Sequence, residues 1–372
     1  MLDPRMTKLA KLLVNYSCEI KEGEKVYIST SGIPAEMNCE LIKEISKVGG
    51  MPFNHIGNAR ISREMNKHIT KEQLEIMVKY DLPLMKEMDA YIGIGGYEND
   101  TEGSDVPHSQ LDLIKNVYGT PVLNERVNNT KWVILRWPTP SMAQRACMST
   151  EAFEDFFFDV CTLDYEKLKK AEQVLIDRMD KADKVHLVGP NDTDLTFSIK
   201  GIKSIGCWGD RNIPDGEVYT APVRDSINGV IHYNCPTIYD GKPFVDVRFV
   251  FEKGKIVEAT GSDPKGINSI LDSDEGARYV GEFSLGVNPK IDRPMRDILF
   301  DEKISGSIHL TPGRAYEEAF NGNDSKIHWD LVMIQTKEYG GGEIWFDDEL
   351  IRKDGIFVPE YLKSLNPDNF VL

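Results

Sequence analysis

The chain has 372 residues, more than one hydrophobic core usually serves, so we expect two domains. Hydrophobic residues make up 41% of it and charged residues 28%, which is enough apolar material for packed cores. The 44 lysines and arginines are outnumbered by 60 aspartates and glutamates, so the net charge is -16, and no basic run offsets it. We therefore expect no nucleic-acid partner.

The compartment follows from the N-terminal segment, the hydropathy and the cysteines. The first residues, MLDPRMTKLAKLLVNYS, interrupt an apolar pattern with charges and predict an amphipathic helix rather than a signal peptide. No stretch approaches the length of a membrane span, so we expect no membrane association. The cysteines contain no C-x-x-C pair and suit neither a disulfide scaffold nor a thiolate zinc site. These features predict a cytoplasmic protein with free thiols.

Strand and helix patterns alternate along the first part of the chain. EKVYIST at residues 24–30 predicts a buried strand, and the next segment predicts a helix opened by Pro34 and closed by Gly49 and Gly50. The scheme repeats through MPFNHIGNA, KEQLEIMVKYDLPLMKEM, DAYIGIGG, SQLDLIKNVYG and TKWVILRWP. Alternation of this kind is typical of βαβ units, so we predict an N-terminal α/β domain with a parallel sheet over residues 1–160.

The pattern changes after Pro138. Residues 138–182 read as nearly continuous helix and predict a connection between domains. From KVHLVGP onward, short strands separated by Gly, Asn and Asp dominate, with hairpin turns expected at Lys253-Gly254 and Asp354-Gly355. We predict a larger, β-rich α+β domain over residues 161–372.

Residues with metal-binding chemistry gather in this second part. The segments are NIPDGEVYTAPV with Glu217, GEFSLGVNP with Glu282, SGSIHLTPGRAY with His309 and Tyr316, and KIHWDL with His328 and Asp330. His328 and Asp330 are two residues apart in an apolar run of strand character, so they are expected on one face. Burying them is costly unless they are paired or bind a metal, and zinc, cobalt and manganese accept such ligands.

The donor types suit two divalent metals about 3.5 to 4 Å apart, joined by a bridging carboxylate and a shared water. Glu282 lies at a glycine-flanked strand position, and Glu217 is expected in a loop after Pro214 and Gly216. Each residue taken alone also has an ordinary explanation. His309 could be a structural histidine, the two glutamates solvated surface acids, and Tyr316 a packing residue, and the spacing leaves these alternatives open.

Several segments in the same order resemble a known family. RWPTPSMAQRACMSTEAFEDFFFDVCTLDY and NIPDGEVYTAPV are similar to segments of the aminopeptidase T / aminopeptidase S family of metallopeptidases, also called the thermophilic aminopeptidase family. The resemblance extends over nearly the whole chain. It implies a two-metal site, Tyr316 as an active-site residue, and a homodimer that encloses the site. The implied ligands are Glu217, Glu282, His309, His328 and Asp330.

On this reading the protein is a metal-dependent aminopeptidase that removes N-terminal residues from peptides through a water activated by two metals, which are zinc, cobalt or manganese. Tyr316 would donate a hydrogen bond to the developing oxyanion, and Glu217 or Glu282 would transfer the proton. The alternative is a non-catalytic nucleotide- or peptide-binding α/β protein. Gly93-Ile94-Gly95-Gly96 follows a strand, but Glu98 stands where G-x-G-x-x-G needs its third glycine, and HExxH is absent.

Overall fold

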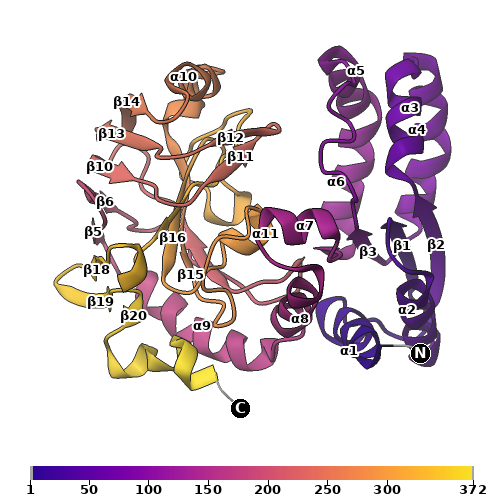
Figure 1. The fold of residues 1–372 in the computed structure, drawn as a ribbon, viewed down its shortest axis with the longest axis horizontal. Helices are drawn as coiled ribbons and strands as arrows, with labels where there is room; N and C mark the ends of the chain where they lie inside the picture. Colours follow the sequence, from indigo (N-terminus) through magenta and orange to yellow (C-terminus); the bar gives the residue numbers. More distant parts are fainter. Residues whose placement is uncertain (1–2, 371–372) are drawn as a thin grey trace. The chain divides into compact units, whose positions relative to one another are not determined.

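A five-stranded sheet has the order β2-β1-β3-β4-β8. Its strands are β1 Lys25–Ser31, β2 Met51–Gly57, β3 Ala90–Gly95, β4 Lys131–Arg136 and β8 Asn212–Ile213. Figure 1 labels three of these strands, β1, β2 and β3. The computed structural model describes residues 3–370. Every pairing in this sheet is parallel, which confirms the predicted βαβ architecture.

Six α-helices alternate with strands β1 to β4 along the chain, and the sequence signals predict both ends of one of them, α2. They are α1 Pro4–Leu12, α2 Ala35–Lys47, α3 Ala59–His68, α4 Lys71–Lys86, α5 His108–Ile114 and α6 Thr120–Asn129. Helix α2 begins directly after Pro34 and is followed by Gly49, whose φ of +82° is a left-handed conformation that glycine adopts easily. Thr70 and Gln73 form a capping box at the start of α4.

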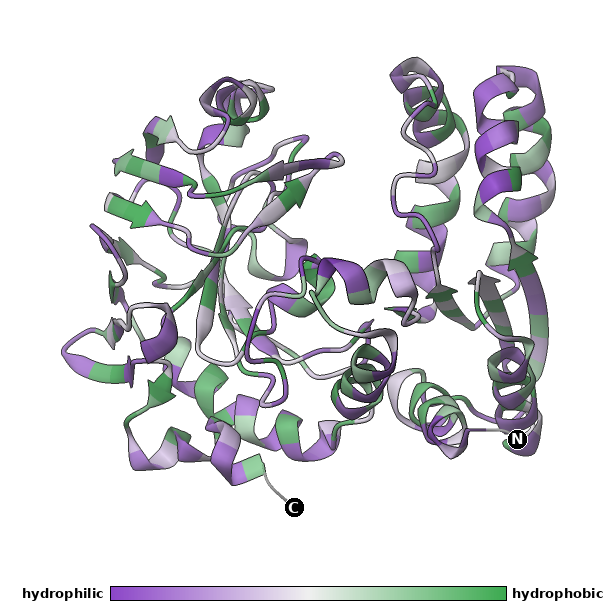
Figure 2. Cartoon of the chain, in the orientation of Figure 1, coloured by the Kyte–Doolittle hydropathy of each residue, from purple (hydrophilic) through white to green (hydrophobic). Residues whose placement is uncertain are grey.

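Three helices occupy the stretch predicted as a helical connection, namely α7 Pro140–Arg145, α8 Thr150–Cys161 and α9 Tyr165–Met179. The chain divides into two compact units within this stretch. One unit extends to Leu163 and also includes Gly209–Ile213, and the other comprises Asp164–Trp208 and the chain from Pro214 onward. Polar and apolar residues alternate around α9, whose apolar side is buried (Figure 2). The division into domains at residues 1–160 and 161–372 stays a prediction.

Two antiparallel sheets build the second unit. The larger has the order β14-β13-β10-β6-β5-β18-β19-β20, and the smaller β17-β16-β15-β9-β7. The larger sheet contains β5 Lys184–Val188, β6 Asp194–Ser198, β10 Asn228–His232, β13 Arg248–Glu252, β14 Lys255–Thr260, β18 Glu343–Phe346, β19 Glu349–Lys353 and β20 Ile356–Phe357. The smaller contains β7 Ile205–Cys207, β9 Glu217–Thr220, β15 Val280–Gly286, β16 Ser307–Pro312 and β17 Val332–Ile334. The predicted β-rich α+β architecture is thereby confirmed.

The remaining elements of this unit are short. They include the hairpin β11 Thr237–Tyr239 and β12 Lys242–Phe244, helices α10 Pro264–Leu271 and α11 Ile298–Asp301, and several 3-10 turns. Both predicted turns are present. Lys253 and Gly254 have φ values of +47° and +80°, and Asp354 and Gly355 have +50° and +82°, as hairpin turns of this kind require.

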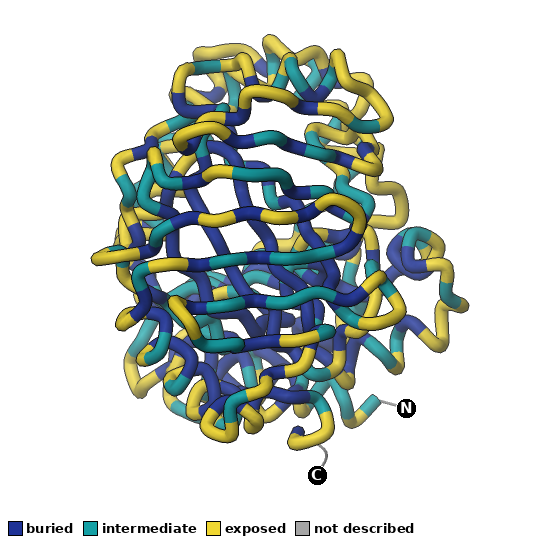
Figure 3. Tube along the Cα trace, turned by 90° about the vertical axis from the view of Figure 1, so that its left-hand side faces the viewer, coloured by how far each residue is buried: buried dark blue, intermediate teal, exposed yellow. Residues whose placement is uncertain are grey.

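The smaller sheet is the buried layer of the second unit. Strands of the larger sheet alternate between buried and exposed positions and cross in front of strands that are almost wholly buried (Figure 3). Every residue of β9, β15 and β16 is buried. A polar side chain on this layer is therefore costly unless it is hydrogen-bonded, ion-paired or metal-bound.

Two further sequence predictions concern the thiols and the membrane. All six cysteines are free, as the absence of paired motifs predicts. Within residues 3–370, no helix combines the length and apolar character that crossing a bilayer requires.

Candidate metal centre

The register of the buried sheet brings three predicted residues together. In central strand β15, Ser284 lies opposite His309 of β16 on one side and Tyr219 of β9 on the other. Side chains alternate between faces along a strand, so Glu282 shares the face of Ser284 and Glu217 shares the face of Tyr219. Strand pairing thus collects Glu217, Glu282 and His309 on one face.

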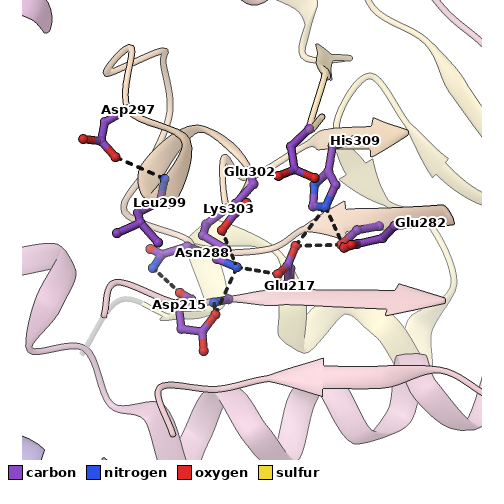
Figure 4. A network of polar contacts seen from close by, with 12 residues as sticks. Asp215, Glu217, Glu282, Asn288, Asp297, Leu299, Glu302, Lys303 and His309 are labelled. Carbon is purple, nitrogen blue, oxygen red and sulfur yellow. Dashed lines mark hydrogen bonds and ion pairs between the residues drawn. The ribbon is translucent and has the colours of Figure 1, made fainter. Parts of the chain in front are cut away.

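These three buried residues form what we call the inner half-site. His309 Nε2 lies 2.9 Å from Glu282 Oε1 and 3.3 Å from Glu217 Oε2 (Figure 4). The Ser284 hydroxyl donates a hydrogen bond of 2.9 Å to Glu217 Oε2. Candidate ligand atoms from all three residues lie within 4.8 Å of one another, close enough to share one cation.

Glu282, His328 and Asp330 form a second cluster, the outer half-site. His328 Nε2 lies 3.3 Å from Glu282 Oε2 and 3.2 Å from Asp330 Oδ1. His328 Nδ1 is 2.8 Å from the carbonyl oxygen of Arg314, so Nδ1 carries the proton in this contact and Nε2 faces the carboxylates. The Thr311 hydroxyl donates to Asp330 Oδ1 at 2.7 Å. Glu282 therefore joins the half-sites, with one oxygen toward each histidine.

Two local predictions need correction. Glu217 is the first residue of β9 rather than a loop residue. His328 and Asp330 precede β17, which begins at Val332, and His328 makes only an isolated bridge to Gly313. The hydrogen-bond ladder between this segment and β16 is interrupted at Pro312. The carbonyl oxygen of Pro312 accepts from the Trp329 N–H at 3.1 Å, but proline has no N–H to donate in the opposite direction. The expected consequence of strand spacing nevertheless holds, since the side chains of His328 and Asp330 meet.

Tyr316 lies beside the outer half-site. It precedes the short 3-10 turn Glu317–Ala319, and its ring centroid is 4.8 Å from that of His328 and 5.6 Å from that of Tyr219. The residue is 48% exposed, whereas the inner half-site is buried. The outer half-site, with its half-buried His328 and Asp330, is accordingly the side of the centre nearer to solvent.

The electrostatics of the centre favour positive charge. Burial opposes the charged form of His309, but Glu217 and Glu282 outweigh it and raise its pKa to about 9. Burial likewise opposes charge on His328, yet Asp330 and Glu282 raise its pKa well above the usual range. Although burial favours the neutral acids, the two histidines lower the pKa values of Glu282 and Asp330.

The donor set fits divalent cations. Among residues 3–370, the only cationic partners recorded for Glu282 and Asp330 are histidines, which become neutral ligands when they lose a proton. Each half-site then offers one imidazole nitrogen and two carboxylates. Nitrogen and oxygen donors of this kind suit zinc, cobalt and manganese.

A buried lysine next to the inner half-site was missed from the sequence. Lys303 is wholly buried, and its Nζ contacts Glu217 Oε1, Asp215 Oδ1 at 3.3 Å and Glu302 Oε1 at 3.0 Å (Figure 4). The three acidic partners raise its pKa well above the usual value, against the effect of burial. Nothing around Lys303 in the sequence marks it, because its contact with Glu217 spans 86 positions.

Cys207 does not extend the centre. Its sulfur lies within 4.8 Å of carboxylate oxygens of Asp215 and Glu217. Burial, followed by the charges of those two acids, raises the pKa of its thiol well above the usual value, and the thiolate is the form that binds metals. The Lys303 ammonium already supplies a positive charge to the same carboxylates.

Comparison with known proteins identifies the family. Residues 2–355 match the model of the thermophilic metalloprotease family M29. The chain belongs to this family. The resemblance seen in the sequence is thus confirmed, and the family's description implies a metal.

Relatives of this chain are named aminopeptidases. Aminopeptidase T of Thermus thermophilus is 35% identical over 144 residues, which cover 34% of this chain and 35% of that protein. The match therefore spans about a third of that relative's length. Aminopeptidase PepS of Streptococcus thermophilus is 22% identical over 406 aligned positions, covering 95% of this chain and 96% of that protein.

Solved structures share the fold. Wild-type AmpT from Thermus thermophilus superposes with a TM-score of 0.82 at 21% identity, covering 96% of this chain and 99% of that chain. A 2,5-dihydroxypyridine dioxygenase from Pseudomonas putida KT2440 superposes with a TM-score of 0.61 at 14% identity, covering 97% and 99%. Because these two proteins are named for different chemistries, the shared fold alone does not decide the reaction.

Proposed function

We propose that the protein is a metal-dependent aminopeptidase that releases N-terminal residues from peptides. The observation that carries the proposal is the position of Glu282, whose oxygens face His309 at 2.9 Å and His328 at 3.3 Å. A carboxylate shared by two imidazole-carboxylate clusters suits a bridged pair of cations. Membership of a metalloprotease family and the names of the relatives support the same assignment.

The proposed ligands are Glu217 and His309 for one cation, His328 and Asp330 for the other, and Glu282 for both. When bound, two divalent cations polarise a carbonyl and lower the pKa of a water toward neutrality. Zinc, cobalt and manganese are the candidates, since all accept these donors.

The chain's own side chains have proposed roles around the reacting peptide. Tyr316, exposed beside His328, would donate a hydrogen bond from its hydroxyl to the oxyanion as charge develops on the carbonyl oxygen. Glu217 and Glu282 stay the candidates for proton transfer to the leaving amine. Ser284 and Thr311 orient the carboxylates through hydrogen bonds to Glu217 and Asp330.

Substrates with a blocked N-terminus separate this proposal from its alternatives. A free α-amine can bind a cation or pair with a carboxylate, and acetylation removes that capacity. We expect peptides with free N-termini to be shortened one residue at a time and their acetylated forms to survive, as followed by mass spectrometry. A chelator should stop cleavage, and zinc, cobalt or manganese should restore it.

Other outcomes of that experiment support different functions. Internal cuts, or equal cleavage of acetylated peptides, would contradict an exopeptidase. If the protein bound metal but left all peptides intact, the non-catalytic nucleotide- or peptide-binding alternative would be preferred.

Metal affinity is expected to rise with pH. Below the pKa of His309, about 9 in the metal-free centre, the imidazole holds a proton that a cation must displace. His328 has a raised pKa as well. The apparent affinity should therefore increase by about tenfold per pH unit for each proton displaced. Zinc titrations by calorimetry at about pH 6, 7 and 8 measure this, and a flat profile would contradict displacement of protons.

The compartment and the assembly also stay proposals. Six free cysteines suit a reducing environment, so we propose a cytoplasmic enzyme. The homodimer implied by the family resemblance remains to be measured, for example by light scattering.

A further inference from the structure

We propose that Lys303 is a positioning residue of the metal centre, which holds Oε1 of Glu217 so that Oε2 faces the cation of the inner half-site. The inference rests on the proposed metal centre and adds to it a role that the ligand set does not include. It is drawn from a buried contact between β9 and the segment that follows α11.

The two oxygens of Glu217 have separate partners. Oε1 contacts the Lys303 ammonium, while Oε2 accepts from Ser284 and lies 3.3 Å from His309 Nε2 (Figure 4). A carboxylate held in this way presents one oxygen to a cation and cannot rotate freely. Such outer partners of a ligand determine its orientation and contribute to metal affinity.

Lys303 is itself held in place from the opposite side. Its Nζ also contacts Asp215 and Glu302, and no part of its side chain is exposed. Asn288 Nδ2 donates to the backbone oxygen of Asp215 at 2.6 Å, and the Asp215 N–H donates to Tyr165 Oη at 3.1 Å. The loop before β9 is thereby fixed, and Asp215 faces the ammonium rather than solvent.

Gly216 allows this loop to approach so closely. Its φ is +130°, and a Cβ atom there would lie 3.0 Å from the backbone of Asn288. Asp215 and Glu217, on either side of this glycine, can therefore both reach Lys303.

Charge explains why the partner is a lysine. Asp215, Glu217 and Glu302 are three acids that share one buried ammonium. Burial raises the pKa of Glu302 to about 8, so the charged pair is Asp215 and Glu217. Without the ammonium these two carboxylates would repel each other, and Glu217 would turn toward whichever donor remained. A neutral side chain of similar size fills the same space but cannot hold the carboxylate by charge.

The test measures zinc binding rather than peptide cleavage. Calorimetry with a competing chelator is expected to resolve two affinities in the wild type, and Glu217→Gln and Asp330→Asn would assign them to the inner and outer half-sites. Lys303→Met is expected to weaken the inner half-site by about 10- to 100-fold, the usual effect of losing an outer partner, and to leave the outer one within about threefold. Lys303→Arg keeps the charge and should bind more tightly than Lys303→Met, although methionine is closer to lysine in shape.

A double variant tests the route of the effect. Because Lys303 acts through Glu217, adding Lys303→Met to Glu217→Gln should cause no further loss. Lys353→Met, which removes an exposed lysine paired with Glu343, is the matched control and should behave as wild type. If Lys303→Met does not fold, Asp215→Asn tests the same role, because it keeps the lysine but removes one of the charges that hold it. Zinc binding at the inner half-site is then expected to be severalfold weaker.

Three results would overturn the inference. They are unchanged inner affinity in Lys303→Met, equal losses at both half-sites, or, where Lys303→Met is unfolded, unchanged inner affinity in Asp215→Asn. A wild-type protein that binds no zinc would instead overturn the proposed metal centre, and with it this role.

Discussion

Replacing Glu282 with glutamine is expected to lower kcat/KM by about a thousandfold or more, because both half-sites lose their shared carboxylate. The two oxygens of Glu282 face His309 and His328, so no other single residue among those described contributes to both clusters. Metal content, measured by mass spectrometry after dialysis, should fall at both half-sites. Glu217→Gln and Asp330→Asn should each weaken only one half-site and leave the other filled.

The fold should survive this substitution, since glutamine has the shape of glutamate. Circular dichroism and thermal unfolding check this point. Glu252→Gln is the matched control, because Glu252 is exposed at the end of β13, and it should keep full activity and metal content. An active Glu282→Gln protein with two bound cations would exclude the bridging role.

Replacing Tyr316 with phenylalanine is expected to lower kcat by about 10²- to 10³-fold while metal content stays at the wild-type level. The hydroxyl is proposed to act on charge that develops only in the transition state, so KM should change little. The ring should keep its place beside His328 and Tyr219, because phenylalanine makes the same ring contacts. Steady-state kinetics with a free-amine peptide measure both constants.

Tyr361→Phe serves as the control, since Tyr361 is an exposed tyrosine whose hydroxyl donates to Glu349. It should leave kcat and KM unchanged. A Tyr316→Phe protein in which KM alone rises would assign Tyr316 to substrate binding rather than to the oxyanion.

Much of the fold was predictable because its signals are local. Pro34 and Gly49 bound α2, and Lys253-Gly254 and Asp354-Gly355 occupy the predicted turns. No local signal predicts that Gly209–Ile213 belongs to the first unit. Strand β8 has only two residues, too few to show a periodic pattern. Its parallel pairing with β4 joins segments far apart in the chain, and hydrophobic periodicity does not predict such pairings.

The site was predictable in its residue types but not in its arrangement. The sequence motifs and the family resemblance indicated the five candidate ligands, and the structure places them in two adjoining clusters. The partners of those ligands were missed. Ser284, Thr311 and Lys303 are common residue types in unremarkable contexts, and only their contacts distinguish them.

The sequence by itself determined the alternating and β-rich halves, the hairpin turns and the meeting of His328 with Asp330, because each depends on residues close together in the chain. Only the tertiary structure decided that Ser284 lies opposite His309, that Glu282 joins the half-sites, and that Lys303 reaches Glu217. The physical reason is that strand register and buried ion pairs are contacts between distant segments. They follow from how whole sheets pack and bury charge, which no short stretch of sequence specifies.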